Sequence, residues 1–137
     1  MLVTTLFMLA IGLPSLGGKH NSAPVPPNSD ISYIESKISL PSEAPGPLPR
    51  YERYYAWTID NGRKYIYAVY IFSDLLDKNK IDPNGIHIHA VTEAEIPNIS
   101  NGGCGVITFY FNPRGDSTPS LYCNPVGPAT TPTTTPP

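Results

Sequence analysis

Four consecutive residues between the only two cysteines of the chain place opposite charges on either side of a glycine: Arg114, Gly115, Asp116 and Ser117. An exposed carboxylate such as that of Asp116 can complete the oxygen coordination of a divalent cation. A guanidinium such as that of Arg114 can form a bidentate pair with an acidic group. Glycine permits backbone geometries that other residues avoid, so the two charges can point outward and apart. These residue types suit recognition of a partner better than catalysis.

The surrounding sequence predicts a loop that displays the tripeptide. The apolar, strand-like run 106–111 is followed by turn-forming residues over 112–119 and by a short return strand over 120–123. Turn residues between two apolar runs predict a hairpin, with Arg-Gly-Asp at its tip. We expect Cys104 and Cys123 to form one disulfide, because two cysteines in a secreted chain most simply pair.

The ends of the chain predict a secreted protein. Residues 1–17 are typical of a secretory signal peptide, and their apolar run is too short to span a bilayer. Residues 18–30 form a Pro-rich segment that we expect to be disordered, and residues 124–137 form a Thr/Pro-rich, mucin-like tail. Asn98 begins an N-glycosylation sequon, which agrees with an extracellular location. The expected folded domain is residues 31–123.

We expect this domain to be mainly β, a small antiparallel sheet or meander with one short helix. Two β-prone runs, 54–59 and 64–72, flank the turn residues 60–63, in which Asn-Gly tolerates the positive φ of a tight hairpin. The second run is apolar on both faces, so it should be a central strand. Further strands are expected over 31–40, 86–91, 106–111 and 120–123, and the helix over 74–80.

Charge and motif content argue against several classes of protein. The net charge of −2 gives no reason to expect a nucleic-acid or anionic-membrane partner. The chain contains no G-x-S-x-G and no H-E-x-x-H motif, and both cysteines are expected to be oxidised. Its carboxylates are scattered along the sequence at Asp74, Asp77, Asp82, Glu93 and Glu95. We therefore expect a monomeric protein that is not an enzyme and has no segment inserted in a membrane.

His87 and His89 are the alternative candidates for chemistry. At positions i and i+2 of a strand, the two imidazoles would share one face and could bind one metal ion. A third ligand would be needed, with Glu93, Glu95 and His20 as the choices. The simpler interpretation is two surface histidines on the polar face of a half-buried strand, since two ligands alone make a poor site. We expect no metal and no cofactor.

The segment from Pro113 to Pro119, inside its predicted disulfide loop, resembles the integrin-blocking loops of disintegrin-like proteins from the saliva of blood-feeding arthropods such as ticks. The resemblance covers only Cys104 to Cys123, and small disintegrins usually carry many more cysteines. It implies integrin binding through Arg114, Gly115 and Asp116, with the divalent cation held by the receptor. It also implies inhibition of cell adhesion or platelet aggregation.

Three other functions are open for the same sequence. A secreted protease inhibitor would offer Arg114 to a trypsin-like pocket on the same rigid loop. A small-ligand binder would use Trp57 and the Tyr-rich sheet, although the chain is short for an eight-stranded ligand barrel. In a mucin-like surface protein the Arg-Gly-Asp sequence would be an ordinary turn.

Overall fold

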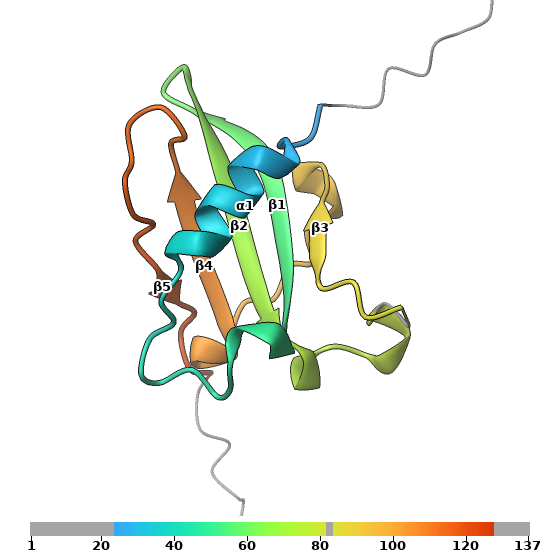
Figure 1. Ribbon diagram of the computed structural model, residues 1–137. Helices are drawn as coiled ribbons and strands as arrows, with labels where there is room; N and C mark the ends of the chain where they lie inside the picture. Colours follow the sequence, from blue (N-terminus) through green and yellow to red (C-terminus); the bar gives the residue numbers. More distant parts are fainter. Residues whose placement is uncertain (1–23, 82–83, 128–137) are drawn as a thin grey trace, which may run out of the picture.

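The computed structural model describes residues 24–81 and 84–127, which form a five-stranded mixed sheet and one α-helix (Figure 1). The elements are α1 (Asn28–Lys37), β1 (Tyr51–Asp60), β2 (Arg63–Phe72), β3 (Ile88–Ala90), β4 (Val106–Phe111) and β5 (Tyr122–Cys123). Short 3-10 turns lie at Leu48–Arg50, Ser73–Leu75, Lys78–Lys80, Glu93–Glu95 and Gly103–Gly105. The predicted signal peptide 1–17 lies outside the described residues, as do residues 18–23, His20 among them, and residues 128–137 of the tail.

The hairpin of β1 and β2 is confirmed. The two strands pair antiparallel over their full lengths, from Tyr51 opposite Phe72 to Asp60 opposite Arg63. The turn uses Asn61 at φ 49° and Gly62 at φ 74°, the left-handed backbone that Asn-Gly tolerates. β2 lies between β1 and β4, and its second half is buried on both faces, as expected of a central strand.

The sheet has the order β3-β1-β2-β4-β5, and one pairing differs from the expected antiparallel arrangement. β3 runs parallel to β1, with His89 opposite Tyr54, while all other neighbours are antiparallel. β3 and β4 run in the same direction at separate positions in the sheet, so the chain between them must cross over β1 and β2. Residues 91–105 make this connection, and their length is typical of such a crossover.

The predicted strand over 31–40 is wrong, because residues Asn28–Lys37 form α1. Ile31 and Ile34 are buried on one face of the helix, and Ile38 packs beside them, which is helical spacing. Asp30 lies in the first turn, where a negative charge is favourable, and Pro27 precedes the helix. Residues 28–30, expected to be disordered, therefore begin the helix.

The short helix expected over 74–80 is instead the pair of 3-10 turns Ser73–Leu75 and Lys78–Lys80.

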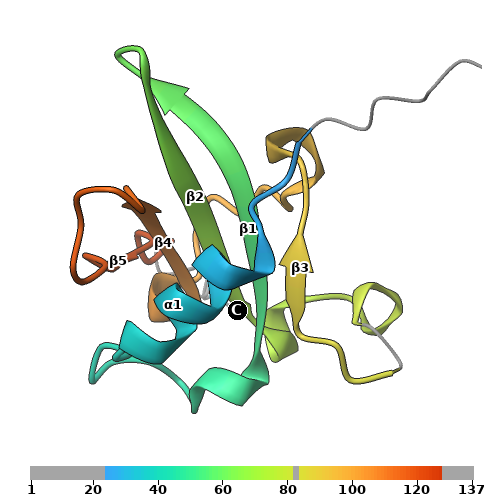
Figure 2. The same cartoon turned by 45° about the horizontal axis from the view of Figure 1, so that its top comes forward.

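Each face of the sheet has its own apolar core. α1 covers one face, and Figure 2 shows the β1–β2 hairpin extending beyond the helix. The core under α1 consists of Ile31, Ile34, Tyr51, Tyr55, Ile66, Ala68, Tyr70, Phe72, Ile107, Phe109 and Phe111. The opposite face carries Tyr54, Val69, Ile71 and Val106, covered by side chains of the connecting segments, among them Leu76, Val91, Ile96 and Ile99.

A polar cluster inside the first core joins α1 to the sheet. The hydroxyl of Tyr55 donates to the carboxylate of Glu35, and the hydroxyl of Tyr70 lies 2.5 Å from that of Tyr55. Arg53 Nε lies 3.2 Å from Glu35 Oε1, an ion pair without hydrogen-bond geometry. The terminal guanidinium nitrogen Nη1 of Arg53 donates to the carbonyl of Leu48 at 2.7 Å. The partly buried carboxylate of the helix therefore has partners on β1 and β2, which offset the cost of removing it from water.

We predict that alkaline pH unfolds the protein through Tyr55 and Tyr70. Burial raises the pKa of both phenols far above the usual value of about 10, and the neighbouring Glu35 carboxylate raises it further. The unfolded chain therefore loses these protons first, so the contribution of the two phenols to stability is constant below about pH 10 and falls above it by about 1.4 kcal/mol per pH unit for each phenol. Phenolate absorbance at 295 nm should appear together with loss of the near-UV circular dichroism.

The variant Tyr70→Phe is the matched control, because it removes one of the two phenols. Its free energy of unfolding should fall less steeply above pH 10 than that of the wild type. Ionisation of Tyr55 and Tyr70 in a protein that keeps its near-UV signal would contradict the prediction.

Candidate functional site

Arg114, Gly115 and Asp116 lie in the connection between β4 and β5, and all three are exposed. The expected hairpin exists, but it is wide: β5 pairs only with Ile107 and Thr108 of β4. The tripeptide follows directly after the end of β4, in a turn over residues 113–115, rather than at the middle of a tight hairpin.

Asn112 organises this turn through four hydrogen bonds. Its carbonyl oxygen accepts the backbone N–H groups of Gly115 at 3.1 Å and Asp116 at 2.9 Å. Its side-chain Oδ1 accepts the N–H of Arg114 at 3.0 Å, and its own N–H donates to Asp116 Oδ2 at 2.7 Å. The backbone of the tripeptide is therefore closed on the residue that precedes it, which fixes the direction in which Arg114 and Asp116 leave the turn.

Gly115 has a steric role that differs from the expected one. It is not among the residues with positive φ, so its backbone is not barred to other residues. A Cβ at this position would instead lie 3.1 Å from Asn112 Nδ2, closer than most real contacts. Glycine thus leaves room for the Asn112 side chain that holds the turn.

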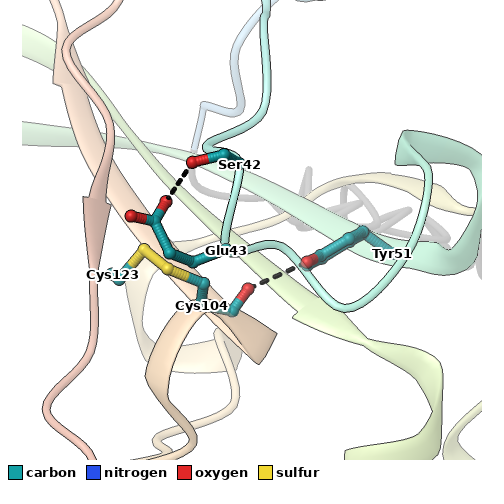
Figure 3. The surroundings of a disulfide bond; sticks show 5 residues. All are labelled: Ser42, Glu43, Tyr51, Cys104 and Cys123. Atoms are coloured by element: carbon teal, nitrogen blue, oxygen red, sulfur yellow. Dashed lines mark hydrogen bonds between the residues drawn. A yellow bond between two sulfur atoms is a disulfide. The ribbon is translucent and has the colours of Figure 1, made fainter.

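The predicted disulfide between Cys104 and Cys123 is confirmed, with Cα atoms 4.4 Å apart. Figure 3 shows it beside Tyr51, whose hydroxyl donates to the carbonyl of Cys104 at 2.8 Å. Cys104 precedes β4 and the tripeptide follows it, so the whole length of β4 separates the disulfide from the turn. The disulfide therefore fixes the returning arm of the loop, while Leu121 packs that arm against the core under α1.

His87, the residue before β3, and His89 of β3 lie on one side of the sheet, as the sequence predicted, and the side chain between them is Glu52. His87 Nδ1 lies 2.6 Å from Glu52 Oε1, and His89 Nε2 lies 2.7 Å from Glu52 Oε2. The Glu52 side chain is 0% exposed, and the two imidazoles are partly exposed at 32% and 21%. Each imidazole can donate one N–H to the carboxylate, so the buried charge has two hydrogen-bond donors.

This arrangement is a clamp on the edge strand. Within the described ranges, no group of three or more His, Cys, Asp or Glu side chains is placed to hold a metal ion. The backbone of β3 is bound to β1 as well, since Arg53 N donates to the carbonyl of His87 at 2.8 Å. The ring of Tyr54 stacks on His89 with centroids 4.8 Å apart. Two imidazoles and one carboxylate thus hold a strand of only three residues against β1.

Of the other predicted metal ligands, Glu95 has a local role. Its carboxylate accepts the N–H of Thr92 at 2.8 Å and the hydroxyl of Thr92 at 2.7 Å, a capping box at the start of the turn Glu93–Glu95. These two bonds to Thr92 lower the pKa of the Glu95 carboxyl.

Asn98 of the sequon is exposed, whereas the following Ile99 packs against the core on the face of the sheet opposite α1.

Glu52 is the residue that sequence reasoning missed. A Glu-Arg pair inside a run of aromatic strand residues, at 52 and 53, would have indicated two buried charges on opposite faces, each needing a partner. The sequence does not show which residues those partners are, because β3 comes to β1 from 35 positions further along the chain.

Comparisons with protein-family models, with curated proteins and with solved structures found no match. The part of the chain that the structure covers includes no helix long and apolar enough to cross a membrane.

Removal of the disulfide should destabilise the β4–β5 arm. In the variant Cys104→Ala/Cys123→Ala, we expect the free energy of unfolding to fall by about 3 kcal/mol, the loop-closure entropy of a ring of this size. Denaturant unfolding measures the loss, and hydrogen exchange should show it at the amides of β5 before those of β1 and β2. An unchanged unfolding midpoint would contradict this account of the arm.

The Glu52 clamp makes a second prediction. His87→Ala/His89→Ala leaves a buried carboxylate without donors, so the free energy of unfolding should fall by about 2 kcal/mol or more. Adding Glu52→Gln to this variant removes the charge and should restore part of the loss, as measured by urea unfolding. Glu93→Gln, an exposed acid, serves as the control and should have no effect. A double histidine variant as stable as the wild type would show that the clamp contributes nothing.

Proposed function

We propose that the protein is a secreted ligand of an integrin-type adhesion receptor, and that it acts by blocking adhesion or platelet aggregation. Arg114, Gly115 and Asp116 form the contact. The observation that supports this most is the exposed turn closed by Asn112, because it presents both charges on a backbone that is already ordered. An ordered loop loses little conformational freedom on binding.

Asp116 supplies the carboxylate for a divalent cation held by the receptor. Its Oδ2 accepts the N–H of Asn112, and among the described residues none donates to Oδ1. One oxygen therefore orients the carboxylate while the other is open to a metal ion, which prefers hard oxygen ligands. Arg114 supplies the opposite end of the contact, a guanidinium that can pair with a receptor carboxylate in bidentate geometry.

Several features together support an extracellular location. The Cys104–Cys123 disulfide is typical of oxidising compartments. The exposed Asn98 sequon, the apolar leader of residues 1–17 and the Thr/Pro tail are typical of secreted glycoproteins. We propose that Asn98 is glycosylated and that the mature protein is extracellular.

The protease-inhibitor alternative has less support from the loop. Arg114 lies in a turn whose backbone N–H groups at 115 and 116 bond to the carbonyl of Asn112. A trypsin-like enzyme places a basic side chain in its specificity pocket from an extended backbone on either side of it. The turn would have to open before Arg114 could bind in that way, whereas receptor binding uses the turn as it is.

We predict that Asp116→Glu abolishes receptor binding. One added methylene displaces the carboxylate from the receptor cation and from the N–H of Asn112, and losing a central contact of this kind should weaken the affinity by at least about 30-fold. Surface plasmon resonance on a panel of immobilised integrins, with Mn²⁺ and then with EDTA, measures the effect. Asp77→Glu, an exposed acid outside the loop, is the matched control and should bind like the wild type.

Two results would overturn the proposed function. One is the absence of binding to every integrin by disulfide-bonded wild-type protein. The other is binding that persists in EDTA and in Asp116→Glu, because contact through a metal-bound carboxylate cannot survive either change. Inhibition of trypsin that is lost in Arg114→Ala but kept in Asp116→Glu would favour the protease inhibitor.

A further inference from the structure

A cavity of about 570 Å³ opens beside the tripeptide. Three separate segments form its wall: the first turn of α1, the hairpin between β1 and β2, and the start of the β4–β5 loop. The lining residues are Asp30, Trp57, Gly62, Arg63, Lys64, Asn112, Pro113 and Arg114. The segments meet because Ile66 of β2 pairs with Phe111 of β4, which brings the end of β4 beside the hairpin turn. Its volume is within the range of small-molecule sites.

The cavity gathers positive charge in a chain that is negative overall. Arg63, Lys64 and Arg114 are exposed and line it, whereas the whole chain has a net charge of −2. In residues 24–81 and 84–127, ion pairs involve Arg50, Arg53 and the two clamp histidines, and none involves these three cations. Three cations outside any ion pair outnumber the one carboxylate of the lining, Asp30, and therefore favour an anionic ligand.

Trp57 gives the cavity an aromatic wall. Lys64 Nζ lies 4.0 Å from the centroid of the Trp57 ring, a cation–π contact that holds the ammonium in place. Asn112 and Asp30 add polar groups of different character, an amide and a hydrogen-bond acceptor. The site therefore combines cations, an acceptor and an apolar ring face.

We propose that this cavity binds a sulfated sugar chain, with Arg63, Lys64 and Arg114 contacting sulfate groups and Trp57 packing against the apolar face of a sugar ring. Guanidinium groups match the geometry of tetrahedral oxyanions, which accept two parallel N–H bonds. Asp30 favours a sugar over an acidic peptide side chain, because a sulfated sugar carries hydroxyls that can donate to its carboxylate, whereas an ionised carboxylate side chain has no donor.

This inference does not depend on integrin binding, because Arg63, Lys64 and Trp57 lie outside the tripeptide. Arg114 belongs to both sites, however. A sulfated sugar bound in the cavity would occupy the guanidinium that the receptor contact needs, so the two ligands should compete.

The single tryptophan of the chain makes a direct test possible. Titration of the disulfide-bonded protein with a heparin tetrasaccharide should change the fluorescence of Trp57 saturably, and the change should weaken as salt is raised. Arg63→Ala and Arg114→Ala should each lower the affinity about tenfold, the effect of one charge-assisted contact. Lys78→Ala is the matched control, an exposed cation on the turn Lys78–Lys80, and should leave the affinity unchanged.

Three comparison ligands identify what is recognised: the same tetrasaccharide without its sulfate groups, inorganic sulfate, and an acidic peptide. The proposal expects binding of the sulfated sugar at least about tenfold tighter than any of them. It is overturned if the fully sulfated sugar leaves Trp57 fluorescence unchanged, or if the desulfated sugar or the peptide binds as tightly. It is equally overturned if the double variant Arg63→Ala/Arg114→Ala, shown to be folded by circular dichroism, keeps the wild-type affinity. None of these results depends on an integrin.

Discussion

The pairing of β1 with β2 is the constraint on which the remaining structure depends. Their continuous ladder from Tyr51 opposite Phe72 to Asp60 opposite Arg63 fixes which side chains of β1 point to each face. Glu52 faces one side and contacts His87 and His89 at β3, whereas Arg53 and Tyr55 face the other side and contact Glu35 of α1. The edge strand and the helix thus attach to opposite faces of the same four-residue segment, and β4 attaches to the free edge of β2.

The same strand pairing positions the candidate binding surface, which consists of the turn at Asn112 and the cavity beside it. β2 fixes the position of β4, and β4 ends at Phe111, directly before Asn112, so the turn of Asn112 lies beside the hairpin that carries Arg63 and Lys64. Backbone pairing thereby places residues of the β1–β2 hairpin and of the β4–β5 loop around one cavity, to which the first turn of α1 adds Asp30. The disulfide acts at the other end of β4, where it fixes the returning arm. The turn and the returning arm are thus two parts of one loop with separate supports.

The features that sequence predicted correctly depend on neighbouring residues. The turn at Asn61-Gly62, the strand 106–111 and the pairing of the only two cysteines all follow from local rules. The strand expected over 31–40 is a helix instead because isoleucine and serine favour strands and loops, and burial of Ile31 and Ile34 overrides that preference. The parallel place of β3 and the partners of Glu52 could not be predicted, since both depend on contacts between distant segments. The hydrogen bonds of Asn112 are local, within four residues, but the sequence pattern predicts only a turn there and not which residue closes it.

The alternation of charge at Glu52 and Arg53 also protects the fold against strand misalignment. A slip of β1 by one residue would turn each side chain to the opposite face of the sheet. Glu52 would then face Glu35, a second negative charge, and Arg53 would face the apolar side chains of Val69 and Ile71. A misaligned hairpin would therefore lose both polar attachments and gain a repulsion and an unsolvated cation in their place. Two adjacent residues of opposite charge thus favour the correct register of the sheet, and they do so as soon as the first hairpin packs against the helix.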